Sequence, residues 1–87
     1  MSKKVEEKKN EFEILGVYFV SHVNLGKALE MRTNVFQGQT ILGEHVGISL
    51  WDSNFLRLDY TNKSDGYQAY SELVPMAQVS KILFKQA

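Results

Sequence analysis

The stretch that most constrains the fold is MRTNVFQGQTILGEHVGIS, an alternation of apolar and polar residues interrupted by glycines. Its first part, together with the preceding Leu29, predicts a strand. Leu29, Met31, Thr33 and Val35 would form the buried face of this strand. Gly38 then marks a turn. A second strand is expected over Thr40–Leu50, and the glycines inside it, Gly43 and Gly47, predict a bulge or a tight bend.

Further short strands follow in the second half of the chain. Phe55–Tyr60 predicts a strand with Leu56, Leu58 and Tyr60 on one face. After the turn-rich TNKSDG, we expect strands over Tyr67–Val74 and Ser80–Phe84, interrupted at Pro75. An alternative for the end of the chain is a helix that starts at Pro75. Short strands joined by regular turns favour an all-β fold, a small, strongly bent antiparallel barrel.

The beginning of the chain is less determined. Phe12–Val23 has apolar residues at both helical and strand spacing, and Gly16 together with the strand formers VYFV favours the strand. Met1–Asn10 is a highly charged tail, either a short helix or without fixed structure. We therefore expect a tail over 1–10 and a single domain over 11–87.

Composition narrows the classes of function. The chain has no cysteine, which excludes disulfides and thiolate chemistry. Ten basic residues balance ten acidic ones, so there is no broad positive field for phosphates. No apolar run reaches the ~18 residues of a membrane span, and the start lacks the apolar core of a signal peptide, which favours the cytoplasm. Phosphate-loop, metal-helix and nucleophile-elbow motifs are missing, so we expect no enzyme and no cofactor.

The glycine-punctuated stretch resembles the first Sm motif of the Sm-like (LSm and Hfq) family. That motif is an alternating strand, a glycine turn and a second glycine, and then a loop with an acidic residue and asparagine before an L-x-L strand. Here the loop is SLWDSNFLRL, with Asp52 and Asn54 before Leu56 and Leu58. The segment LVPMAQVSKI is similar to the second motif, so that the resemblance covers residues 29–84. Other SH3-like barrels would share much of this pattern.

The resemblance implies that an open strand edge joins neighbouring subunits into a homo-oligomeric ring, of roughly five to seven copies. A short chain without disulfides also favours association as a source of stability. The resemblance further implies binding of single-stranded RNA. Aromatic side chains can stack on bases while polar ones read base edges. The candidate RNA-binding residues lie in and after the loop: Trp51, Asp52, Asn54, Phe55 and Arg57.

Each candidate also has a structural interpretation. The loop aromatics can fill the end of a barrel, and Arg57 and Lys63 can be ordinary surface cations. Arg32 can pair with Glu30 on an outward face. The histidines, His22 and His45, have no ligand pattern around them, so no metal site is expected. Tyrosines 60, 67 and 70 are explained by pairing across a hairpin.

The second motif lacks the Arg-Gly turn of the family and reads Pro75–Ala77 instead. Two further functions therefore remain open. The chain can be a small protein–protein interaction module, or a structural ring subunit without a ligand of its own.

Overall fold

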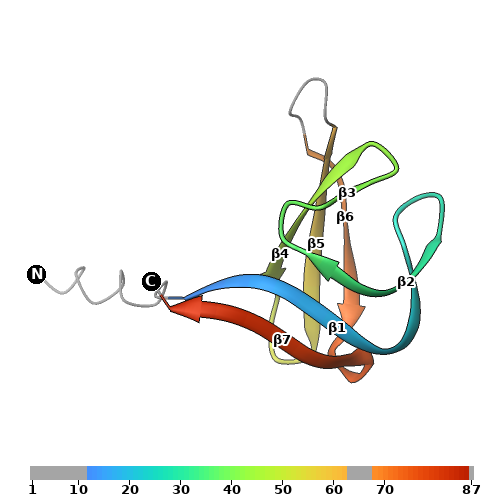
Figure 1. The fold of residues 1–87 in the computed structure, drawn as a ribbon. Helices are drawn as coiled ribbons and strands as arrows, with labels where there is room; N and C mark the ends of the chain where they lie inside the picture. The colour runs from blue at the N-terminus through green and yellow to red at the C-terminus, as the bar shows by residue number, and fades with distance from the viewer. Residues whose placement is uncertain (1–11, 63–67, 87) are drawn as a thin grey trace, which may run out of the picture.

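The computed structural model describes residues 12–62 and 68–86, in which all regular elements but one are strands (Figure 1). They are β1 (Phe12–Leu25), β2 (Glu30–Phe36), β3 (Thr40–Ile41), β4 (Glu44–Leu50), β5 (Phe55–Asn62), β6 (Gln68–Pro75), the 3₁₀ helix η2 (Met76–Gln78) and β7 (Val79–Gln86). The predicted all-β class is confirmed. The charged tail Met1–Asn10, Lys63 and Tyr67 lie outside the described residues.

The strands form two antiparallel sheets, with the orders β2–β1–β7 and β3–β4–β5–β6. β2 pairs with β1 and β3 pairs with β4, so the chain passes between the sheets at residues 37–39. Figure 1 shows β1 and β7 as a curved pair that passes beneath β4, β5 and β6. The barrel that we expected is not closed. Within residues 12–62 and 68–86, β6 pairs only with β5, because the chain turns at η2 and β7 pairs with β1.

The ambiguous segment 12–23 is part of the long strand β1. Val17 and Phe19 are buried, and the register to β2 shifts between Tyr18 and Val23. Gly16 lies against Phe36, whose ring a Cβ at that position would overlap. The glycine that disfavours a helix therefore has a packing role in the sheet, because it lets an aromatic ring lie flat on the strand.

The prediction of one strand over Thr40–Leu50 was wrong. The chain forms β3, a two-residue turn at Leu42 and Gly43, and then β4. Both turn residues have positive φ, 49° and 88°, as a type I′ hairpin turn requires. Gly43 thus marks a hairpin turn, and Gly47 pairs with Asp59 in an unbroken register between β4 and β5, so neither glycine marks a bulge. Gly38 does lie in a turn, with φ 78°.

The end of the chain follows the strand prediction. The alternative of a helix starting at Pro75 was wrong, since only the single turn η2 forms before β7 begins at Val79. The turn is held by a hydrogen bond from Met76 N to Asn54 O, 2.8 Å long.

The core lies between the two sheets. The predicted face of Leu56, Leu58 and Tyr60 is confirmed, and all three side chains are fully buried. The predicted apolar face of β2 was wrong except at Val35. Leu29 lies in the turn before the strand, Met31 pairs with Asn24 beyond the register shift in β1, and Thr33 lies at the shift, and all three are exposed. A shift of register changes which face of a strand meets the core, and here Val35 is buried.

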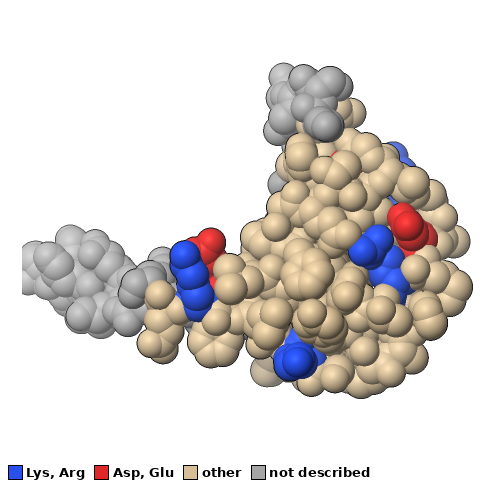
Figure 2. All heavy atoms as spheres, viewed as in Figure 1, with Lys and Arg blue, Asp and Glu red and all other residues tan. Residues whose placement is uncertain are grey.

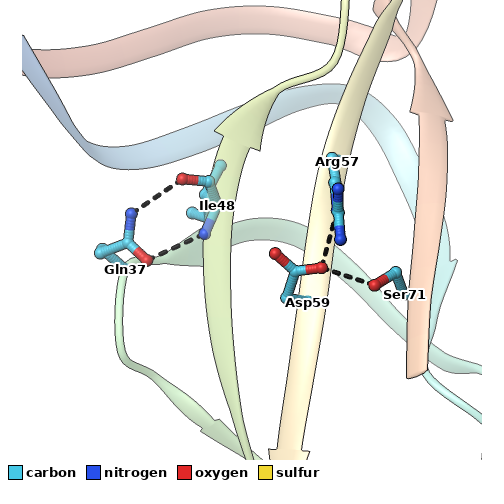
Figure 3. A network of polar contacts seen from close by, with 5 residues as sticks. All are labelled: Gln37, Ile48, Arg57, Asp59 and Ser71. Atoms are coloured by element: carbon cyan, nitrogen blue, oxygen red, sulfur yellow. Dashed lines mark hydrogen bonds and ion pairs between the residues drawn. The ribbon is translucent and has the colours of Figure 1, made fainter. Parts of the chain in front are cut away.

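The side chain of Gln37 connects the two sheets at the bend. Its Nε2 donates to Ile14 O (3.1 Å) and Ile48 O (3.0 Å), and its Oε1 accepts from Ile48 N (2.9 Å). Figure 3 shows the amide lying along β4 as a strand's peptide group would. Backbone groups of β1 and β4 that have no neighbouring strand here are satisfied by one side chain.

We expect Gln37→Ala to lower the free energy of unfolding by about 2–3 kcal/mol, because three part-buried hydrogen bonds are lost together. Urea denaturation of both proteins measures the change. Gln39→Ala is the matched control, since Gln39 makes one exposed bond with its side chain, to Phe36 N, and its loss should cost less than about 1 kcal/mol. Equal effects of the two substitutions would contradict the bridging role.

Candidate functional site

The loop between β4 and β5 carries most of the predicted RNA-binding residues. Asp52 Oδ1 accepts from Asn54 N (2.7 Å) and Phe55 N (3.0 Å). Trp51 N and Asp52 N donate to Phe55 O, at 3.1 and 3.3 Å. Asp52 therefore organises its own loop, as short acidic side chains often do in turns.

Asn54 and Phe55 connect the same loop to η2 and to β6. Asn54 accepts through its backbone oxygen from Met76 N, which ties the loop to η2, and its side chain is exposed. Phe55 is half-buried and lies opposite Pro75 in the β5–β6 register. These contacts fix the loop at one end of the sheet and leave Trp51, 54% exposed, at its surface.

The structure brings Trp51 and Arg57 together. The guanidinium carbon of Arg57 lies 5.4 Å from the centre of the Trp51 ring, within the range of a cation–π contact. Arg57 Nε also donates to Asp59 Oδ1 at 2.8 Å, and Ser71 Oγ donates to the same oxygen at 2.5 Å (Figure 3). The charge of Arg57 is therefore balanced on the sheet itself.

A hollow of about 280 Å³ lies beside this pair, along β5 and β6. Its walls are Trp51, Arg57, Ser71, Glu72 and Leu73. An exposed ring, a compensated arginine and an exposed leucine can stack on a flat group or cover an apolar side chain. We call this the tryptophan surface.

Sequence reasoning missed a second polar cluster, on the inner side of the same sheet. Tyr60 and Tyr70 stack, with ring centres 4.6 Å apart, which confirms the predicted cross-strand pair. The hydroxyl of Tyr60 donates to Glu72 Oε1, and Gly26 N donates to the same oxygen at 3.0 Å. The carboxylate of Glu72 thus joins the β1–β2 turn to the sheet.

Tyr70 makes the corresponding connection on its own side. Its hydroxyl accepts from Lys27 N (2.9 Å) and donates to Glu44 Oε1 (3.1 Å). The ammonium of Lys27 lies 5.2 Å from the centre of the Tyr70 ring. The two tyrosines were identifiable from the sequence, whereas their partners Glu44 and Gly26 come from distant strands and turns.

The remaining candidates have ordinary surroundings. Arg32 lies 3.8 Å from Glu30 and donates to Asn34 O, as expected of a surface cation. His22 is exposed, and His45 Nδ1 lies 3.3 Å from Thr40 Oγ1. No group of three or more potential metal ligands comes together in the described part of the chain. Among the same residues, no helix is long and apolar enough to cross a membrane.

The face drawn in Figure 2 is largely uncharged, and basic side chains lie beside acidic ones on it. This face offers phosphates no extended positive strip, so binding of nucleic acid there would rely on local stacking.

Burial, and next the hydrogen bond to Glu72, raise the pKa of Tyr60 well above its ordinary value. The neutral phenol is therefore favoured in the folded state, and this stability is present below about pH 10 and lost as the pH rises further. We expect the free energy of unfolding to fall by up to about 1.4 kcal/mol per pH unit from this group. Denaturant unfolding measured from pH 8 to 11 should show a smaller loss of stability per pH unit for Tyr60→Phe than for the unsubstituted protein.

Comparison with protein-family models, with curated proteins and with solved structures finds no significant match for this chain.

Proposed function

We propose that the protein is an Sm-like subunit that assembles into a homo-oligomeric ring in the cytoplasm and acts by binding and not by catalysis. The observation that supports this most is the pair of open edges at β6 and β7, each of which has a strand on one side only in the described residues. Open edges present backbone donors and acceptors in a row, and pairing with another copy satisfies them.

The charges of the two edges favour a head-to-tail contact. β6 carries Glu72 and no basic residue, whereas β7 carries Lys81 and Lys85 and no acidic one. Pairing β7 with β7 would bring lysines together, whereas pairing β6 with β7 of the next copy avoids this repulsion. A contact between two different edges repeats around a circle and can close into a ring.

The tryptophan surface supports single-stranded RNA as the ligand of this assembly. Trp51 offers an exposed ring to a base, and Arg57 extends the flat surface beside it. Asp52 supports the loop instead of reading a base, and Asn54 is an exposed polar group beside it. A second candidate is a protein-interaction module, favoured by the near neutrality of the chain and by the exposed Leu73 in the same hollow.

We expect a solution mass of roughly five to seven subunits, measured by size-exclusion chromatography with light scattering at two protein concentrations. Leu73 lies on the outer face of β6, 44% exposed, and Lys81 lies on the outer face of β7. When two sheets join edge to edge, side chains on the outer face of one strand lie beside those on the outer face of the other. Leu73→Lys should therefore place a second positive charge near Lys81 of the next copy and weaken assembly at least about tenfold. Leu73→Glu is the matched control and should still assemble. A monomer at both concentrations would overturn the ring.

RNA binding is tested by fluorescence anisotropy with U-rich and A-rich oligomers at several salt concentrations. We expect Trp51→Ala to weaken binding about tenfold, because stacking contributes about 1–3 kcal/mol per base. Leu50→Ala, a neighbouring exposed side chain without a ring, should leave the affinity unchanged. No salt-dependent binding at micromolar protein would exclude RNA, and the interaction module would then be the better interpretation.

A further inference from the structure

A cavity opens at the end of the molecule where the β1–β2 turn meets the β3–β4 hairpin. Its volume is about 220 Å³, several times the ~30 Å³ that one water molecule occupies in the liquid. The floor consists of the core residues Leu25, Ile41 and Tyr60, of which only Ile41 has any exposed surface, and the other lining residues are Gly26, Lys27, Ala28, Leu42 and Glu44. We call it the mouth pocket.

Leu42 has an unusual conformation for a residue at this rim. Its φ is 49°, in the left-handed region that disfavours a leucine, and its side chain is 66% exposed. Glycine or asparagine would suit the turn better, and burial does not compensate for the leucine. Strained residues are often retained where a site needs their side chains. Leu29, in the facing turn, has φ 55° and is 63% exposed, but it does not line the pocket.

Most backbone donors around the pocket are already engaged within the protein, and a carboxylate acceptor is left for a ligand. The N–H groups of Gly26 and Lys27 already donate to Glu72 and Tyr70. Within residues 12–62 and 68–86, Tyr70 is the one side-chain donor to the carboxylate of Glu44, and it uses Oε1. Glu44 and Lys27 both line the pocket, and the Lys27 ammonium lies over the Tyr70 ring, 5.2 Å from its centre, so the carboxylate of Glu44 is the charged acceptor beside the apolar floor.

We propose that the mouth pocket binds an aliphatic primary ammonium group. The hydrocarbon chain lies between Ile41 and the exposed side chain of Leu42, and the ammonium donates to the carboxylate of Glu44. A charged hydrogen bond inside a partly enclosed pocket gives the selectivity, and burial of the chain gives most of the affinity. The site is separate from the edges β6 and β7 and from the tryptophan surface, so it goes beyond the proposed assembly.

The probes are isoamylamine, isoamyl alcohol and isovalerate, which share one branched skeleton and differ in charge. Methyl-labelled full-length protein is titrated with each at neutral pH, with the Ile41 methyl as the reporter on the floor and Ile82 as the distant reference. We expect the amine to cause saturable chemical-shift changes at the Ile41 methyl. The alcohol should bind at least about tenfold more weakly, and isovalerate should not bind. Equal affinity for amine and alcohol, or no saturable shift, would overturn the proposal.

Three variants separate the roles of charge and shape. Glu44→Gln keeps an acceptor for Tyr70 and removes the charge. The pocket should therefore lose its preference of about tenfold for the amine over the alcohol. Leu42→Gly should weaken the binding of the amine and of the alcohol by the same factor. Leu29→Gly relieves the same kind of strain outside the pocket and should leave both affinities unchanged. A variant Glu44→Gln that still prefers the amine, or equal weakening by the two glycine substitutions, would refute the site.

The ammonium group can come from a free amine or from a lysine side chain of a protein. A lysine capped at both backbone ends tests the second source, with its Nε-acetylated form as the control. Binding of capped lysine that acetylation abolishes assigns the site to protein-borne lysine, whereas binding of isoamylamine without capped lysine assigns it to a small amine. Tight binding of the acetylated form would show that charge is not recognised, and would contradict the proposal.

Discussion

The amide of Gln37 is the interaction on which the arrangement of the two sheets depends. At this point β2 has ended its pairing with β1 at the Gly16–Phe36 pair, and β3 begins its pairing with β4 three residues after Gln37. The backbone of Ile14 and Ile48 would otherwise face a gap. A side-chain amide has one donor end and one acceptor end, as a peptide group has, so it can occupy the place of a strand there.

The same bend determines where the molecule is open. Because β2 passes into β3 instead of continuing along β1, the turns 26–29 and 42–43 meet at one end and form the mouth pocket between them. The two tyrosine–glutamate pairs hold this end, since Gly26 and Lys27 are bound through their N–H groups to Glu72 and Tyr70. At the opposite side η2 sends β7 to β1, which leaves β6 and β7 as edges.

Local patterns predicted the strands well and their surroundings less well. The alternation in β5 placed Leu56, Leu58 and Tyr60 in the core, because this strand has neighbours on both sides and no register shift over those residues. The same alternation failed for Met31, since the shift in β1 is not visible in the sequence of β2. The partnership of Tyr70 with Glu44 joins residues 26 positions apart through tertiary structure, which no periodicity encodes.

The exposed apolar residues are informative because of where they gather. Single exposed leucines are common on soluble proteins and need no explanation. Here Leu42 stands in a strained turn over a cavity, Trp51 lies beside a hollow, and Leu73 lies on an open edge. None of these three side chains adds to the core, so the stability of the folded chain does not account for them. Leu42 lies at the mouth pocket, and Trp51 and Leu73 line one hollow beside the β6 edge, so at these two places a partner or ligand gains by burying apolar surface.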